Sequence, residues 1–188
     1  MKPPLPLARP ATYDDLLALP DHVVGEIVGG ELHVSPRPGP RHAVTSSVLG
    51  GELGPPFHQG RGGPGGWWIL DQPELHLDDD VLMPDLAGWR RTRMPAIPDT
   101  AWFSVAPDWV CEVLSPGTAQ LDRHRKLQVY ARVGVGHCWL IDPLARTLEV
   151  LQLDSARWTI LAVHSGHEEV RVPPFTETTL SLQRLWTD

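Results

Sequence analysis

The chain has 188 residues, of which 41% are hydrophobic and 21% are charged, and its formal net charge is −7. These values are typical of one globular domain and exclude a disordered chain. No apolar run reaches the roughly 18 residues that a membrane span needs, and the proline-rich start lacks the apolar region of a secretory signal. Two cysteines do not indicate a disulfide framework. We therefore expect a soluble, cytoplasmic protein with no membrane partner.

The basic residues are almost all arginines, fourteen against two lysines. Lys2 lies at the chain terminus, so Lys126 is the only interior lysine. The net acidity argues against non-specific binding of nucleic acid over the whole surface, but it does not exclude a local basic groove.

The first elements are marked by a helix cap and a turn. Thr12, with Asp15 three residues later, forms a capping-box pattern that predicts a short helix through Leu19. Gly29-Gly30 separates two short apolar runs, which predicts a β-hairpin because a tight two-residue turn needs positive φ angles. The hairpin strands are expected at residues 23–28 and 31–35.

Two longer helices and a series of strands follow. The first helix is expected at residues 41–53, and its predicted inward residues are Ala43, Val44, Ser47 and Val48. The second is expected at residues 121–133, after a basic loop at 90–100. Apolar and β-branched runs predict strands at 67–71, 73–77, 81–89, 109–114, 137–142, 146–153, 158–163 and 170–172. This order predicts an α+β (mixed α/β) fold with one central sheet.

Two tryptophans and both cysteines fall within these predicted strands. Trp67 and Trp68 must point to opposite faces of their strand, where packing, a subunit contact and stacking on a base all remain open. Cys111 and Cys138 are expected to be buried thiols on neighbouring strands.

Three acids interrupt apolar strand patterns. Glu112 shares a strand face with Val110 and Leu114, and Asp85 and Glu26 also have apolar neighbours. A buried carboxylate is costly unless it is paired or bound to a metal. Each acid alone fits a salt bridge to an arginine or a strand with one hydrated face. Asp85 and Glu112 together also fit a shared divalent cation, and all-oxygen ligands favour Mg²⁺ or Mn²⁺ over zinc.

The helix after Glu112 carries Asp122, Lys126 and Tyr130 at intervals of four residues, and these share one face. Asp122 and Lys126 also fit an ordinary surface ion pair, and Tyr130 fits a core position. Lys126 becomes a functional candidate if this face turns toward Glu112.

Taken together, several short motifs resemble the Uma-two family of restriction endonucleases, which belongs to the PD-(D/E)xK nuclease superfamily. The motifs are Gly25 to Leu32, His42, Pro84-Asp85, Glu112 to Pro116, the set Asp122, Lys126 and Tyr130, Gly134-Val135, and Trp139 to Pro143. The resemblance covers the chain from about Tyr13 to Asp142, with a looser strand-rich tail.

This resemblance implies a restriction-endonuclease-like core, in which helices flank a central mixed sheet and additional strands follow. It implies a flexible N-terminal tail at residues 1–10 and a single nuclease-like domain at 11–188. The implied activity is metal-dependent hydrolysis of DNA phosphodiester bonds by an endonuclease that uses Mg²⁺ or Mn²⁺. DNA is then the partner, and the chain could form a homodimer.

The resemblance also assigns roles. Asp85 and Glu112 would hold the metal ion and take part in catalysis. The superfamily places a lysine two residues after the second acid, where this chain has Leu114, so Lys126 on the following helix is the candidate for that role. Glu26 would be a helper acid in the catalytic site, and His42 a peripheral polar residue.

Two groups of arginines would place positive charge beside such a site, where DNA phosphates must come. The arginines expected to bind nucleic acid are Arg90, Arg91, Arg93, Arg123 and Arg125. They also fit an ordinary charged surface.

Two other functions compete with the nuclease. One is a catalytically inactive nuclease-fold protein that acts as a binding or assembly module. The other is a strand-rich protein that binds a small ligand in a pocket lined by Glu74 and His76. In that last case, Asp85 and Glu112 would lie far apart.

Overall fold

Two β-sheets meet at the middle of the molecule in this computed structural model, which describes residues 9–187. The smaller, four-stranded sheet begins with the predicted hairpin, β1 (Val23–Val28) and β2 (Glu31–Pro36), joined through Gly29 and Gly30. Both glycines have positive φ angles, +61° and +76°, as the sequence predicts. The short helix α1 (Tyr13–Leu17) precedes the hairpin. The predicted tail at residues 1–10 falls, except for its last two residues, outside the described range.

Strands β4 (Leu75–Leu77) and β5 (Asp80–Leu82) complete this sheet in the order β2-β1-β5-β4. The larger sheet has six strands in the order β10-β9-β8-β7-β6-β3. Its only parallel pair is β7 with β8, and its other pairs are antiparallel. Its strands are β3 (Trp67–Asp71), β6 (Leu86–Arg90), β7 (Trp109–Val113), β8 (His137–Asp142), β9 (Thr147–Asp154) and β10 (Arg157–Ser165).

The single strand predicted at residues 81–89 is wrong, because the chain divides there between the two sheets. Strand β5 pairs with β1, whereas β6 pairs with β3 and β7. Pro84 lies between them and has no amide hydrogen for a strand ladder, so three residues, 83–85, connect the sheets.

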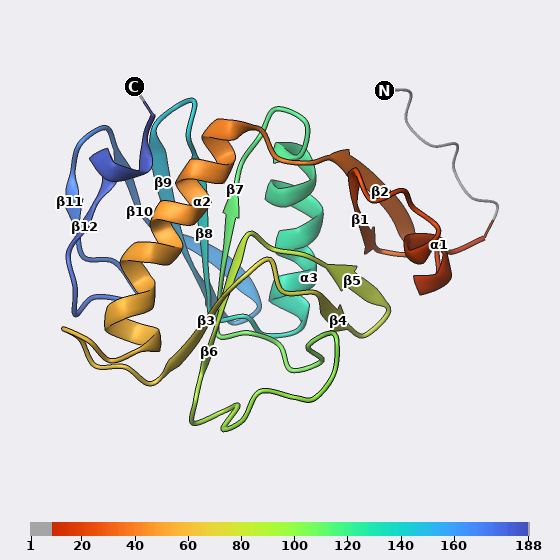
Figure 1. Cartoon of the computed structure of the whole chain (residues 1–188), viewed down its shortest axis with the longest axis horizontal. Coiled ribbons are helices and arrows are strands. Elements are labelled where there is room, and N and C mark those ends of the chain that lie inside the picture. The colour runs from red at the N-terminus through yellow and green to blue at the C-terminus, as the bar shows by residue number, and fades with distance from the viewer. Residues whose placement is uncertain (1–8, 188) are drawn as a thin grey trace.

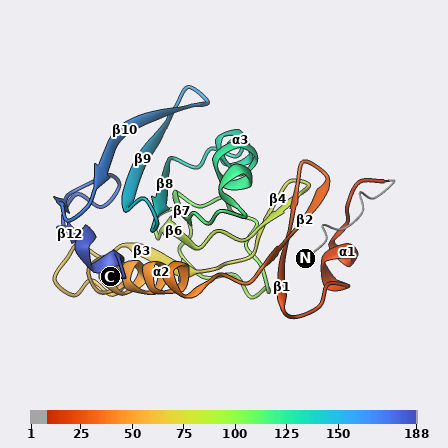
Figure 2. The ribbon, with the colours of Figure 1, turned by 90° about the horizontal axis from the view of Figure 1, so that it is seen from above.

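Helices cover both faces of the six-stranded sheet (Figures 1 and 2). On one face lies α2 (Pro40–Leu53), which the π-helical turn η1 (Gly54–His58) extends. On the other face lies the segment between the parallel strands, which is the π-helical turn η2 (Leu121–Lys126) followed by α3 (Leu127–Arg132). The C-terminal residues add a small hairpin of β11 (Glu169–Val170) and β12 (Leu180–Ser181), and the turn η3 (Leu182–Leu185). The mixed α+β fold with flanking helices is thus confirmed.

The predicted inward face of α2 is largely wrong. The helix buries Thr45, Leu49 and Leu53, whereas Val44 is 39% exposed and only Val48 of the predicted set packs against the core. Gly50 lies against β3, where an added Cβ would come within 2.9 Å of the Asp71 side chain. The Gly50 side of the helix therefore faces β3.

Each face of the large sheet has its own apolar core. Trp67 packs into the core under α2, and Trp68 packs against the core under α3, so the two rings do lie on opposite faces. Cys111 and Cys138 are buried free thiols on the neighbouring strands β7 and β8, as predicted. Among the described residues, no helix has the length and apolar character that a bilayer span requires.

Candidate active site

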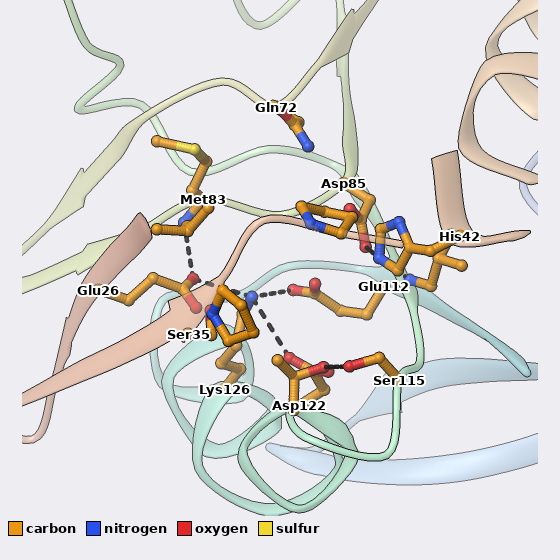
Figure 3. A pocket seen from close by; sticks show the side chains of 15 residues that line it. Glu26, Ser35, His42, Gln72, Met83, Asp85, Glu112, Ser115, Asp122 and Lys126 are labelled. Atoms are coloured by element: carbon orange, nitrogen blue, oxygen red, sulfur yellow. Dashed lines mark hydrogen bonds and ion pairs between the residues drawn. The ribbon is translucent and has the colours of Figure 1, made fainter. Parts of the chain in front are cut away.

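A small cavity lies where the two sheets meet, and most of the acids singled out in the sequence line it (Figure 3). Glu26 reaches it from β1, Asp85 from the 83–85 connection, Glu112 from β7, and Asp122 and Lys126 from η2. Its volume is about 60 Å³. This space holds an ion or a few water molecules but not a nucleotide, so a large substrate could present only one group to it.

Lys126 is the centre of the cluster. Its side chain is 2% exposed, and its Nζ lies 2.9 Å from Glu26 Oε1, 2.9 Å from Glu112 Oε1 and 3.5 Å from Asp122 Oδ1. Dashed lines in Figure 3 mark these three contacts. An ammonium group has three N–H donors, and three carboxylates lie within ion-pairing distance of it.

The helical segment delivers this lysine because η2 follows β7 directly in the β7–α3–β8 crossover. Asp122 and Lys126 are one turn apart on η2, and Tyr130 follows on α3, where its hydroxyl donates to Glu112 Oε1 at 2.5 Å. The face predicted from the spacing does turn toward Glu112. Asp122 and Lys126 are therefore a buried pair rather than an ordinary surface pair.

Asp85 is held at the end of the 83–85 connection. Its Oδ2 accepts a hydrogen bond from the Val113 amide at 2.7 Å and lies 3.1 Å from His42 Nε2. Glu26 secures the other end of the connection, because its Oε1 accepts a hydrogen bond from the Met83 amide at 2.8 Å. The same carboxylates that line the cavity thus join the two sheets.

His42 belongs to the site rather than to its periphery. It lies on the first turn of α2, lines the cavity, and contacts Asp85 through Nε2. Its Nδ1 is buried and has no hydrogen-bond partner among the described residues. A buried ring nitrogen without a partner is a position at which water or substrate can bind.

The protonation equilibria reflect an excess of acid. Burial raises the pKa of Glu112 well above its ordinary value, and Lys126 only partly opposes this shift. Burial also raises the pKa of Asp122. Burial alone would lower the pKa of Lys126, but the attraction of Glu112 and Glu26 outweighs it, and this pKa lies well above its ordinary value. One ammonium among several carboxyl groups explains both the retained proton on Lys126 and the reluctance of Glu112 to ionise.

The residues present suit a divalent cation. The lining carboxylates outnumber the one ammonium, and Asp85 Oδ1 and Glu112 Oε2 accept no hydrogen bond from a described residue. Within residues 9–187, no group of three His, Cys, Asp or Glu side chains could hold a metal ion by itself. Two carboxylates are enough for Mg²⁺, which usually keeps several waters and binds substrate phosphate as well.

The structure thus brings together Asp85, Glu112, Lys126 and Glu26, the four residues predicted for the catalytic site. Asp122 was missed as a site residue, because an acid four residues before a lysine is so common on helix surfaces. Leu114 is buried. The superfamily has its lysine at the position of Leu114, whereas in this chain Lys126 approaches Glu112 from η2, as the resemblance implies.

The predicted nucleic-acid-binding arginines lie outside this cavity wall within the described range, and most have protein partners. Arg123 forms two hydrogen bonds with Glu149, Arg125 pairs with Glu31 at 2.9 Å, and Arg93 pairs with Asp108 at 2.9 Å. The remaining two stack on tryptophans: Arg90 on Trp67, and Arg91 on Trp68.

The small-ligand hypothesis loses its basis. Glu74 accepts a hydrogen bond from Tyr13 at 2.8 Å and lies 2.7 Å from His76 Nε2, so its Oε1 is engaged within the protein. Asp85 and Glu112 share one cavity instead of lying far apart.

Comparisons with known proteins identify the family and the fold. The model of the Uma2 family, described as "Putative restriction endonuclease", matches residues 11–184. The chain is also similar to the crystal structure of "a putative nuclease belonging to DUF820" from Anabaena variabilis ATCC 29413. That similarity has 25% sequence identity and a TM-score of 0.75, and it covers 94% of this chain and 97% of the other. No curated protein matches. Because the family model spans nearly the whole chain, the protein belongs to the Uma2 family, the family that its motifs resemble, and it has a nuclease fold.

Proposed function

We propose that this protein is a metal-dependent DNA endonuclease whose active site is the cavity around Glu112. The observation that carries the proposal is the convergence of Asp85, Glu112 and Lys126 on one buried cavity from three separate segments of the chain. A carboxylate pair beside an ammonium group suits phosphodiester hydrolysis, in which water attacks phosphorus and the leaving P–O bond breaks.

Asp85 and Glu112 are the residues that would hold Mg²⁺ or Mn²⁺. When bound, such an ion lowers the pKa of a water molecule and stabilises charge on the phosphate. The Val113 amide and His42 orient the Asp85 carboxylate, and Tyr130 and Lys126 orient that of Glu112. Both ligands are therefore positioned before any substrate arrives.

Lys126 is suited to donate to the attacking water or to a phosphate oxygen. Its longest contact, 3.5 Å to Asp122, is the one that can be exchanged most easily for a contact with substrate. Glu26 keeps the ammonium in place through its 2.9 Å contact, which makes Glu26 a positioning residue. The exposed part of Arg90 is a candidate for a phosphate contact outside the cavity.

One observation favours the alternative, an inactive nuclease-fold binding module. Three carboxylates already pair with the ammonium of Lys126, so its charge is compensated without a ligand. Activity measurements therefore have to separate the two functions.

The test is cleavage of supercoiled plasmid and labelled oligonucleotides with Mg²⁺, Mn²⁺ or EDTA. The isosteric variants Asp85→Asn and Glu112→Gln should lose cleavage, because each removes a charged ligand while it preserves side-chain volume. The exposed acids Asp99 and Glu177 supply matched control variants, Asp99→Asn and Glu177→Gln, which should cleave like the wild type. Cleavage in EDTA, or cleavage by both site variants, would contradict the proposal. Complete inactivity on every DNA would favour the binding module.

A further inference from the structure

A second, larger cleft opens beside the catalytic cavity. It has a volume of about 470 Å³ and shares His42 and Ser115 with the cavity. Its wall includes Pro116, Pro143 and Leu144. A cleft of this size is large enough for a nucleotide, whereas the catalytic cavity of about 60 Å³ is not.

The residues that line this cleft are mostly apolar, but they include one arginine. Arg41, on the first turn of α2, lines it, and the Arg41 side chain forms no ion pair or hydrogen bond with any described residue. Three of the arginines considered above, Arg93, Arg123 and Arg125, are instead neutralised by carboxylates. Arg41 is therefore free to contact a phosphate, immediately next to the position where the scissile phosphate would enter.

We propose that this cleft binds an unpaired base next to the scissile phosphate, so that DNA with an unpaired nucleotide at the cleavage position is the preferred substrate. This inference rests on the proposed function. In a paired duplex, neighbouring bases cover both faces of each base, so a base has to leave the stack before it can contact the apolar wall. A nucleotide also matches the charge pattern, because its base is flat with weakly polar faces while its phosphate is anionic.

Binding is measured separately from cleavage, by fluorescence anisotropy in EDTA. Three labelled DNAs are compared: a fully paired duplex, the same duplex with one bulged thymidine, and the same duplex with an abasic bulge. We expect the thymidine bulge to bind about tenfold more tightly than the other two, because burial of one base against apolar side chains contributes on the order of that factor. The abasic bulge has the same flexible backbone but no base, so it separates base binding from DNA bending.

Leu144→Glu tests the wall of the cleft, because it places a charge where the base would lie. Leu144 is 58% exposed, and Ile160 on β10 is also 58% exposed, so Ile160→Glu is a matched control for the effect on folding. The Leu144 variant should lose the preference for the thymidine bulge, and the Ile160 variant should keep it. Equal binding of thymidine and abasic bulges by the wild type, or an unchanged preference in Leu144→Glu, would overturn the inference.

Arg41→Ala tests the phosphate contact. It should weaken binding of all three DNAs and make the negative slope of log affinity against log salt shallower by about one, as expected for one lost phosphate contact. Arg61 is an exposed arginine in the loop between η1 and β3. Arg61→Ala is the control and should not change the slope. An unchanged slope in Arg41→Ala would remove Arg41 from the binding site.

The two proposals fail in different ways. Metal-dependent cleavage without any preference for the thymidine bulge would reject the cleft and keep the nuclease. A clear preference for the bulge that Leu144→Glu abolishes, in a protein that never cleaves, would reject the nuclease and keep the cleft as a binding site.

Discussion

At the scale of single residues, the feature that matters most is the balance between one ammonium and several carboxyl groups. Lys126 is as fully buried as the core aromatics, and it contacts Glu26, Glu112 and Asp122. Without it, these buried acids would face one another with no compensating charge. The lysine therefore stabilises the fold whether or not it also takes part in catalysis.

Lys126→Met should lower the free energy of unfolding by about 3–5 kcal/mol, the usual cost of leaving buried charges without a partner. Glu112→Gln should recover part of that loss in the Lys126→Met background, because it removes one of the unpaired acids. The measurement is urea unfolding followed by circular dichroism. Arg125→Met, which removes an exposed ion pair with Glu31, is the control and should cost about 1 kcal/mol or less. A Lys126→Met protein as stable as the wild type would contradict this account.

At the scale of elements, α2 is tied to the C-terminal end of the chain. Buried Thr45 donates a hydrogen bond from Oγ1 to the Leu185 carbonyl at 2.8 Å, and Leu185 ends η3. The N-terminal turn of the same helix carries His42 into the candidate active site and Arg41 to the cleft. Attachment of the C-terminal turn thus helps to position one wall of the site.

Thr45→Val keeps the side-chain shape but leaves the Leu185 carbonyl without its donor, so it should cost about 1–3 kcal/mol. Ser47→Ala removes a hydroxyl from the exposed side of the same helix and should change stability by about 0.5 kcal/mol or less. Thermal and urea unfolding of the two variants check the difference. Equal stability of the two would mean that this hydrogen bond does not stabilise the docking of α2.

The sequence predicts local elements and the acid cluster well, because both depend on local patterns. Gly29-Gly30 fixes the hairpin, and the spacing from Asp122 to Lys126 fixes the face that meets Glu112. Contacts between distant segments were harder to predict. Periodicity does not reveal that Pro84 separates two sheets, and the packing of Gly50 against β3 joins segments that lie apart in the chain.

At the scale of the whole molecule, the net charge of −7 and the acid-rich cavity suit a protein that gains stability from a bound cation. The cavity lies at the junction of the two sheets, so an ion bound there would strengthen the contact between them. An ion that bound the folded protein and not the unfolded chain would stabilise the whole molecule.

Mg²⁺ or Mn²⁺ should raise the melting temperature, and free metal at 100 times its dissociation constant corresponds to about 2.7 kcal/mol. Differential scanning fluorimetry without DNA measures the shift, with NaCl at equal ionic strength as the control. Asp85→Asn and Glu112→Gln should abolish the shift, whereas the surface variant Asp99→Asn should retain it. A shift of the same size in all of these proteins would place the bound ion elsewhere.

The connection at residues 83–85 has a consequence for how this family can evolve. Glu26 accepts the amide of Met83 and Asp85 accepts the amide of Val113, so these acids hold the two sheets together independently of any reaction. Natural selection for a stable chain would retain them even in a relative without catalytic activity. The presence of these acids in a relative would therefore indicate a shared architecture rather than a shared activity, whereas Arg41 and the cleft that it lines take no part in this contact between the sheets.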